Sequence, residues 1–271
     1  MLNIVVITKT VVPIVSTVKV DEKTGSLIRE GVPTTLNPWD YAAIDLAIKL
    51  RDEYGGKIVA ISMAPPFAKD VLEDIIGMGV DEAVLVSDRA FAGSDTLATS
   101  YILAAAIRYV MPDFDIVLAG QEAADSLTSH VPAQVASFLS VPYLYYVINV
   151  VKIDLVNKIV NVERILEDED RIEEFKVKLP AVFSVYKKNI ILPVKVSRKI
   201  EAKLNRKVKI ITNRELNLDQ SKIGLAGSPT RVAKVVNYKY EPKSPLKIEK
   251  SCEEFARWLL DLIQEKTREK Q

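Results

Sequence analysis

Residues 116–139, IVLAGQEAADSLTSHVPAQVASFL, contain the pattern on which the fold prediction rests. The apolar run 116–118 predicts a buried strand; Ala119 and Gly120 let another group approach the backbone, and residues 133–139 have helical spacing. A polar loop between the carboxyl end of a strand and a helix is a common phosphate-binding position in open α/β sheets. The stretch has neither a P-loop nor a GxGxxG motif. An ordinary strand-loop-helix connection explains it equally well, so the rest of the chain must decide.

The composition describes a globular chain. Of its 271 residues, 48% are hydrophobic and 27% are charged, which suits one large α/β domain or a main domain with a tail. Lys and Arg number 37 against 36 Asp and Glu, so there is no basic excess for nucleic-acid binding. No apolar run approaches about 18 residues and no charged leader precedes the first apolar run. We therefore expect no membrane insertion and a cytoplasmic protein.

Cysteine and histidine are nearly absent. The chain has one cysteine, Cys252, and one histidine, His130. An internal disulfide, a multi-cysteine metal site and a histidine cluster are thereby excluded. We expect no metal site.

Strands and helices alternate through the first half of the chain. Asn37 and Pro38 have the residue types of a helix N-cap followed by proline at the first helical position. The predicted strands are residues 3–8, 57–63, 81–87 and 114–119, and helices are expected after residue 38 and at 67–78, 95–110 and 133–139. This alternation predicts an α/β fold with a doubly wound, mostly parallel, Rossmann-like sheet. Residues 18–31 are compatible with either a hairpin or a plain loop before the first helix.

The pattern changes after Pro142. Residues 145–152, 158–165 and 172–178 alternate apolar with polar side chains, which predicts an antiparallel extension with one solvated face. The acidic run 167–170 between two of these strands fits a solvated turn better than a metal site. Residues 181–185 are predicted to form another buried strand.

Clean periodicity is lost beyond residue 192. We therefore divide the chain into an α/β nucleotide-binding domain, residues 1–190, and a C-terminal arm and helix, residues 191–271. Residues 249–266 form a predicted amphipathic helix whose narrow stripe includes Phe255, Trp258 and Leu259. Docking on a partner chain is the favoured role of this stripe, and packing back on its own domain is the alternative.

Four segments, taken in order, resemble the β subunits of electron-transfer flavoproteins. They are LNPWD at 36–40, SDRAFAGSDT at 87–96, the turn at 120–125, and GLAGSPT at 224–230. The resemblance implies a heterodimer in which an α subunit holds FAD and this subunit supplies a nucleotide site and an arm that wraps its partner. In simpler members the β site holds AMP. In bifurcating members, which include the nitrogen-fixation-associated proteins, it holds a second FAD, and segments 87–96 and 224–230 are more similar to that group.

The resemblance further implies transient partners and a set of nucleotide-binding residues. Electrons would pass between NADH or acyl-CoA dehydrogenases and a quinone- or ferredoxin-linked acceptor, including a quinone oxidoreductase. No catalytic acid, base or nucleophile is needed, because the flavin ring carries the redox chemistry. The nucleotide would be lined by Ile7, Asn37, Pro38, Trp39, Asp40, Ala60, Met63, Asp95, Thr96, Gly120, Gln121, Glu122, Ala123, Asp125, Ser126, Thr128, Ser129, His130 and Val131.

Several of these residues have suitable chemistry. Ile7 and Ala60 would offer backbone amides at strand ends to an adenine edge. Asp125 and Ser126 would bond ribose or cap the helix, and Thr128 and Ser129 would donate to a pyrophosphate.

The sequence also departs from the family pattern. Glu122 would place a carboxylate near a diphosphate, which costs affinity unless the carboxylate faces a backbone N–H or a cation. His130 stands where the family often has Gln, and it is either a phosphate donor or a surface residue at the start of a helix. Residues 197–204 also differ from the usual recognition loop, so docking of the same acyl-CoA dehydrogenases is in doubt.

A nucleotide-sensing module of the universal-stress type is the alternative function. Such a domain would end near residue 150, whereas this chain continues with its own pattern. An adenine-nucleotide hydrolase or ligase would need a phosphate-activating motif such as SGGxDS, which is absent.

Overall fold

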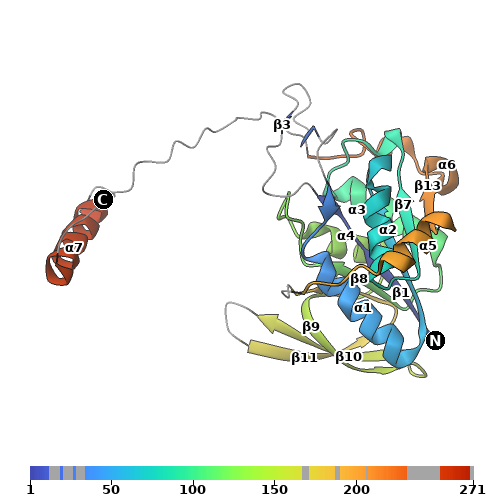
Figure 1. Cartoon of the computed structure of the whole chain (residues 1–271), viewed down its shortest axis with the longest axis horizontal. Helices are drawn as coiled ribbons and strands as arrows, with labels where there is room; N and C mark the ends of the chain where they lie inside the picture. The colour runs from blue at the N-terminus through green and yellow to red at the C-terminus, as the bar shows by residue number, and fades with distance from the viewer. Residues whose placement is uncertain are drawn as a thin grey trace. The chain divides into compact units, whose positions relative to one another are not determined.

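The computed structural model describes residues 1–11, 19–20, 27–28, 34–166, 171–186, 190–205, 207–230 and 251–268. The chain forms two compact units, Met1–Lys234 and Val235–Gln271 (Figure 1). Each unit is described by itself.

A nine-stranded sheet is the centre of the first unit, with the strand order β11-β10-β9-β12-β8-β1-β6-β7-β13. Its strands are β1 (Leu2–Ile7), β6 (Gly56–Met63), β7 (Glu82–Val86), β8 (Ile116–Gly120), β9 (Tyr143–Asp154), β10 (Ile159–Leu166), β11 (Arg171–Lys178), β12 (Ala181–Val185) and β13 (Val208–Ile211). All neighbouring pairs from β9 to β13 in this order are parallel, while β10 is antiparallel to both of its neighbours. The predicted parallel sheet with an antiparallel extension is confirmed.

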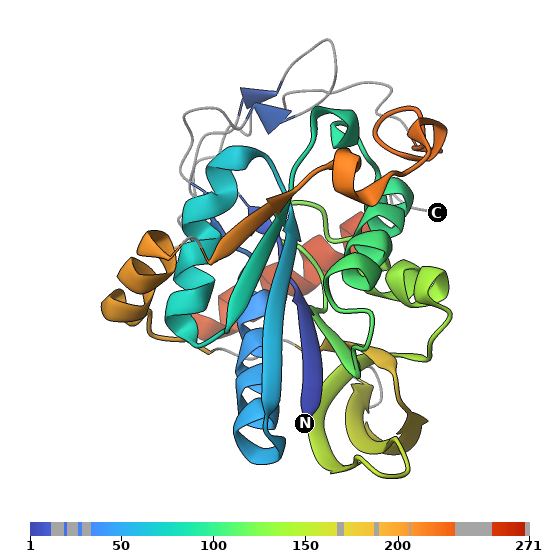
Figure 2. The same ribbon diagram turned by 90° about the vertical axis from the view of Figure 1, so that its right-hand side faces the viewer.

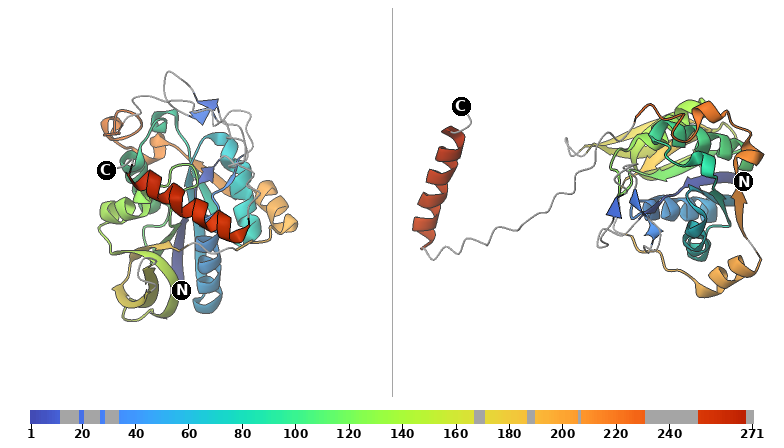
Figure 3. Two further views of the ribbon diagram at one scale, coloured as in Figure 1. Left: turned by 90° about the vertical axis from the view of Figure 1, so that its left-hand side faces the viewer. Right: turned by 90° about the horizontal axis from the view of Figure 1, so that it is seen from above.

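Helices cover both faces of this sheet (Figures 2 and 3). The larger ones are α1 (Asp40–Tyr54), α2 (Lys69–Met78), α3 (Thr96–Val110), α4 (His130–Leu139) and α5 (Val196–Leu204). In β1, Ile4 and Val6 pack into the cluster that contains the apolar faces of α1 and α2. Val5 and Ile7 pack into the opposite cluster with α3 and α4. A strand buried on both faces reads as a continuous apolar run, which is why the first strand was predictable.

Short elements complete the first unit. Strands β2 (Thr10–Val11) and β5 (Thr35–Leu36) pair antiparallel, as do β3 (Lys19–Val20) and β4 (Leu27–Ile28). The second pair favours the hairpin interpretation of residues 18–31, whose remaining residues lie outside the described part of the chain. The other short elements are η1 (Pro66–Ala68), η2 (Arg89–Phe91), α6 (Asn213–Leu216) and η4 (Gln220–Lys222).

The first unit extends well beyond residue 190, where the sequence analysis ended the α/β domain. Helix α5 packs on α2, with an ion pair of 2.5 Å between Lys199 and Asp74. Strand β13 then pairs with β7 as the last strand of the sheet. This edge strand is only four residues long, and its central residues are exposed. Its sequence, VKII, is short and contains Lys209, so it did not suggest a sheet strand.

The start of α1 also differs from its prediction. The helix begins at Asp40 with Trp39 at the N-cap, and Asn37 and Pro38 lie in the turn before it. The Asn37 side chain bonds a different loop, as described below. Asn before Pro therefore marks a turn here and not the helix cap.

The second unit contains α7 (Cys252–Arg268). Its side chains Phe255, Leu259, Leu260 and Ile263 are all at least 40% exposed within the described residues. The predicted amphipathic helix is thus present. The acidic run 167–170 lies outside the described residues. In the described part of the chain, no helix has the length and apolarity needed to cross a membrane.

Candidate functional site

The strand order reverses direction at β1. The strands that follow it, β6 and β7, lie on one side of β1, whereas β8 lies on the other side. Open α/β sheets bind ligands outside the carboxyl ends of the strands at such a switch point. The candidate site is therefore the crevice at the ends of β1 and β8, where residues 7–9 and 120–125 meet.

Asp40 joins three segments at this crevice. Its Oδ2 accepts a hydrogen bond from the Lys9 backbone N–H (2.7 Å), and its Oδ1 accepts one from the Asn37 side-chain amide (2.8 Å). Burial raises the pKa of Asp40 to about 7, although these two donors and the Gly120 backbone N–H oppose the rise. The start of α1 is thereby fixed against the ends of both central strands.

Gly120 makes this close approach possible. A Cβ atom at this residue would lie 2.5 Å from Asp40 Oδ1 and 2.8 Å from the Trp39 carbonyl carbon. The small-residue turn in the sequence is therefore explained by contact with the protein's own α1 start.

Asn37 holds the polar loop that follows Gly120. Its amide N–H donates to the Glu122 carbonyl oxygen (2.8 Å), and its Oδ1 accepts from the Ala124 N–H (3.1 Å). Asn37 is 1% exposed, so these bonds form away from solvent. Asn37, a residue of the LNPWD segment, therefore holds in place the loop that was predicted to bind a nucleotide.

Lys9 was missed by the sequence analysis. Its ammonium group pairs with the Asp125 carboxylate and lies 3.4 Å from the Ser126 hydroxyl. Lys9 lies two residues beyond the end of the buried strand β1, and a charged residue so close to the end of such a strand was the available signal. Asp125 is therefore engaged with Lys9, and neither Asp125 nor Ser126 caps α4, contrary to one of the two roles expected for them.

Glu122 forms hydrogen bonds within its own loop. Its carboxylate accepts weak hydrogen bonds from the Gln121 amide (3.3 Å) and the Ser129 hydroxyl (3.4 Å). These donors are a side-chain amide and a hydroxyl, whereas the sequence prediction required a backbone N–H or a cation, so the hydrogen bonds of the described residues do not meet that condition.

Helix α4 begins at this loop without a side-chain cap. Ser129 at its N-cap has φ 55° and Leu127 has φ 52°, so two non-glycine residues adopt left-handed backbone conformations. Such strain is concentrated at functional sites. The Thr128 side chain is exposed, and so is that of His130, the first residue of the helix. This end of α4 offers N–H groups and hydroxyls, the donor set that a phosphate requires.

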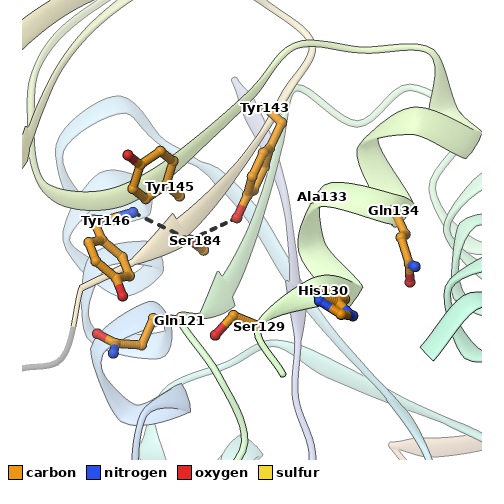
Figure 4. Close-up of a pocket in the computed structure, with 9 residues that line it drawn as sticks. All are labelled: Gln121, Ser129, His130, Ala133, Gln134, Tyr143, Tyr145, Tyr146 and Ser184. Atoms are coloured by element: carbon orange, nitrogen blue, oxygen red, sulfur yellow. Dashed lines mark hydrogen bonds between the residues drawn. The ribbon is translucent and has the colours of Figure 1, made fainter. Parts of the chain in front are cut away.

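A cavity of about 470 Å³ lies between the first turn of α4 and strands β9 and β12 (Figure 4). It is lined by Gln121, Ser129, His130, Ala133, Gln134, Tyr143, Tyr145, Tyr146 and Ser184. Three of these residues, Gln121, Ser129 and His130, were predicted as nucleotide-lining. The three tyrosines were missed, because Tyr145 and Tyr146 were assigned to a strand with one solvated face, residues 145–152, and Tyr143 was given no role.

Some predicted residues do not lie where they were expected. Ala60 is in the middle of β6, paired with Val6 and Ala83 and fully buried, so its amide is not at a strand end. Ile7 and Met63 are the last residues of β1 and β6, as predicted. The end of this strand was predicted correctly at residue 63, so only the strand-end position of Ala60 was wrong, and its place beside a nucleotide stays a prediction.

Asp95 belongs to a separate arrangement at the start of α3, next to Thr96. Its Oδ1 accepts from the Leu97 and Ala98 N–H groups, and its Oδ2 accepts from the N–H and hydroxyl of Thr230. Burial alone would raise the pKa of Asp95, but these hydrogen bonds together lower it. Asp95 therefore fastens the GLAGSPT segment to α3, and both of its oxygens are occupied by protein donors.

Two buried hydroxyl groups near the crevice test whether a nucleotide fits. Thr8 directly follows β1 and Ser62 is the penultimate residue of β6; they are 4% and 1% exposed. In the described part of the chain, neither hydroxyl has a hydrogen-bond partner. Buried polar groups are normally satisfied, so these two are compatible with a bound molecule that carries donors and acceptors. With Lys9 and the α4 start, the donor set fits an adenylate.

Known proteins with similar sequences all point to one family. A family model described as "Electron transfer flavoprotein domain" matches residues 24–213. Electron transfer flavoprotein subunit beta of Clostridium acetobutylicum is 36% identical over 264 residues, which cover 97% of this chain and 98% of that protein. Protein FixA of Azorhizobium caulinodans is 36% identical, with 83% and 80% covered. Subunit CarD of the caffeyl-CoA reductase-Etf complex of Acetobacterium woodii is 39% identical, with 82% of each chain covered.

Proposed function

The chain belongs to the electron transfer flavoprotein family, as a relative of its β subunits, and on that premise we propose that its switch-point crevice binds an adenine nucleotide. One observation supports this proposal most. Asn37 and Lys9 hold the loop at 120–131 in place at the carboxyl ends of β1 and β8. The universal-stress alternative is not favoured, because the family match covers residues 24–213, far beyond residue 150.

The nucleotide is proposed to be a second FAD, with AMP as the other candidate. FixA and CarD, the latter part of a caffeyl-CoA reductase-Etf complex, are similar over most of their length, which favours the bifurcating group. Electrons would enter from NADH or an acyl-CoA dehydrogenase and leave to a quinone- or ferredoxin-linked acceptor.

The protein's own groups bind and orient the nucleotide in this proposal. The Thr128 hydroxyl and the first N–H groups of α4 face the phosphates, and the Ser129 hydroxyl exchanges its weak bond to Glu122 for a phosphate oxygen. Lys9 compensates negative charge at the Asp125 side of the loop. The flavin supplies the redox chemistry when bound, and protein groups position it and tune its potential.

A heterodimer with an α subunit is the state in which this chain would act. The apolar face of α7 is the proposed contact that wraps that partner. Dehydrogenases and a quinone oxidoreductase are proposed as transient partners only.

Counting the bound nucleotides tests the proposal. The chain is co-expressed with an α subunit, and FAD and AMP are extracted from the purified heterodimer and quantified. Two FAD per dimer support the bifurcating type, and one FAD with one AMP supports simple transfer. One FAD without any further adenine nucleotide would contradict a nucleotide site in this subunit.

A further inference from the structure

Asn37 can hold the loop after β8 in only one orientation of its side-chain amide. Its NH₂ group donates to Asp40 Oδ1 and to the Glu122 carbonyl oxygen, both at 2.8 Å, while its Oδ1 accepts from the Ala124 N–H at 3.1 Å. Turning the amide by half a turn would exchange its nitrogen and oxygen. The Glu122 oxygen would then lose its donor and the Ala124 N–H its acceptor. The group that fixes the amide orientation therefore controls the attachment of the loop.

Asp40 fixes this orientation when it is ionised. Within the described part of the chain, its hydrogen-bond partners are all N–H donors: the Lys9 backbone, the Asn37 amide and the Gly120 backbone. An ionised carboxylate only accepts hydrogen bonds, so it requires the NH₂ side of Asn37. A protonated carboxyl has an O–H that needs an acceptor. Of the three partners, only the Asn37 side chain can turn an oxygen towards it.

Burial brings this titration into the neutral range. Asp40 is 4% exposed, and burial raises its pKa to about 7 against the opposing hydrogen bonds and the charge of Lys9. The other titratable side chains of the segments that meet here are Tyr41 in α1 and Glu122 and Asp125 in the loop, and β12 and the crevice end of β6 add none. Burial, Asp74 and Asp40 raise the pKa of Tyr41, so its hydroxyl stays neutral. Both protonation states of Asp40 are therefore accessible near pH 7.

We propose that Asp40 and Asn37 form a proton-operated switch, which holds residues 122–124 when Asp40 is ionised and releases them when it is protonated. The inference rests on the proposed function, because the released segment belongs to the loop assigned to the nucleotide. The held loop is the form that binds. Nucleotide affinity should therefore fall as pH falls through the neutral range.

A direct charge effect would have the opposite sign. An anionic phosphate repels ionised Asp40, which by itself would make binding tighter at low pH. Two features weaken this repulsion: the oxygens of Asp40 face N–H donors, and the charge of Lys9 is close enough to lower its pKa. Release of the loop, in contrast, removes two hydrogen bonds from the site itself. We expect the loop effect to prevail, and the sign of the pH dependence distinguishes the two.

Hydrogen–deuterium exchange of the loop tests the switch without a nucleotide. The heterodimer is freed of the nucleotide of this subunit, and exchange in residues 121–126 is followed by mass spectrometry at pH 6 and pH 8. After correction for the intrinsic rate, protection in wild type should be roughly tenfold lower at pH 6, because a group with a pKa of about 7 goes from mostly ionised to mostly protonated. In Asp40→Asn, whose neutral amide also needs an acceptor, protection should be low at both pH values.

Asp115→Asn is the matched control for this measurement. Asp115 is 6% exposed and accepts a hydrogen bond from the Asn3 N–H, but it lies at the amino end of β8, away from the loop. The control should keep the wild-type dependence of loop protection on pH.

Binding of ADP-ribose tests the consequence for the site. Its diphosphate is esterified at both ends, so the probe does not titrate between pH 6 and pH 8, and it carries the adenylate that FAD and AMP share. The measurements use His130→Gln as the background, because a histidine at the start of α4 would add a pH dependence of its own. The dissociation constant measured by calorimetry should be up to roughly tenfold larger at pH 6 than at pH 8. With Asp40→Asn added, binding should be weak and equal at both pH values.

The two measurements together decide the proposal. Lower protection with weaker binding at pH 6 supports the switch. Protection that does not change with pH overturns it, whether or not the probe binds. Lower protection with tighter binding at pH 6 overturns its control of the site in favour of the charge effect. Lower protection without any binding of ADP-ribose supports the switch but contradicts the proposed nucleotide site.

Asn37→Ala covers the case in which Asp40→Asn does not fold. This variant leaves Asp40 to titrate but removes its link to the loop, so loop protection should be low and independent of pH. Exchange of β1 serves as the reference for global stability. Because burial of an ionised carboxylate lowers global stability as pH rises, the reference should change in the direction opposite to the loop. A pH dependence of loop protection that persists in Asn37→Ala would refute the switch.

Discussion

Asp40 is a buried carboxyl group whose hydrogen-bond donors come from separate segments of the chain. The Lys9 N–H and the Asn37 amide bond its two oxygens, and Gly120 reaches it through the backbone. Burial outweighs these donors in setting its pKa. Residues of the LNPWD segment therefore matter first as structural supports of the crevice.

The raised pKa of Asp40 predicts a pH-dependent stability. The folded value of about 7 exceeds the ordinary value of 3.8, so the folded state retains the proton longer than the unfolded state. The stabilisation is fully present below about 3.8 and is lost as pH rises through about 7. Asp40→Asn should flatten this decline, since the amide does not titrate. It should also cost about 1–3 kcal/mol at pH 5, because an NH₂ group would face a donor, and less at pH 7.5, where the wild type has lost its own stabilisation. Urea denaturation at pH 5 and 7.5 measures both effects. A decline as steep as that of wild type would contradict the assignment.

Gly120→Ala should disrupt the crevice directly. The added methyl would meet Asp40 Oδ1 at 2.5 Å, so we expect a stability loss of about 1–3 kcal/mol and loss of the bound nucleotide. Gly55→Ala is the control. Its Cβ meets nothing within 4 Å, and its cost is backbone strain at φ 68°, far from the crevice. Thermal unfolding and nucleotide extraction compare the two. Retention of nucleotide by Gly120→Ala at the level of Gly55→Ala would show that the contact is unimportant.

At the scale of elements, the strands and helices of the first half follow directly from their sequence patterns. Buried strands β1, β6 and β7 are apolar runs, and the helices between them have 3.6-residue periodicity. The missed feature was β13, a short edge strand with exposed central residues. The tyrosine cavity was also missed, because Tyr146 in β9 has φ 58°, a left-handed conformation that no local sequence pattern marks.

Asp95 joins helix α3 to residues 224–230, which are distant from it in the sequence. Because it caps α3 and bonds Thr230, Asp95→Ala should lower stability by about 1–2 kcal/mol and release residues 224–230 from the helix. The lowered pKa means that this stabilisation is present above the ordinary value of 3.8 and is lost as pH falls through the folded value. Limited proteolysis should then cut within 224–230. Asp219→Ala, which removes only the exposed cap of η4, serves as the control. Equal cutting in both variants would count against the tether.

At the scale of the whole molecule, the two units are expected to have different roles. The first unit contains the complete sheet and should fold by itself, whereas the second is proposed to bind the α subunit. A chain ending at Lys234 keeps the complete sheet, whereas one ending at residue 190 loses α5 and β13 and exposes α2 and the edge of β7. The longer fragment should fold with a cooperative thermal transition but fail to co-purify with an α subunit. The shorter fragment should aggregate. Size-exclusion chromatography of both fragments tests this, and a folded 1–190 fragment would contradict the boundary at Lys234.

Family membership also bears on the isolated chain. We expect the full chain alone to be poorly stable without an α subunit, and we expect a yellow dimer after co-expression. A colourless, monodisperse monomer that ignores an α subunit would contradict this.

The central claim is that the loop at 120–131 is a wall of an adenine-nucleotide site in this subunit. The most direct measurement is the nucleotide content of the heterodimer carrying Asp125→Ala, which removes the partner of Lys9 at the crevice. We predict a marked loss of the nucleotide bound by this subunit, with the FAD of the α subunit retained. Unchanged occupancy of both would contradict the assignment of this loop.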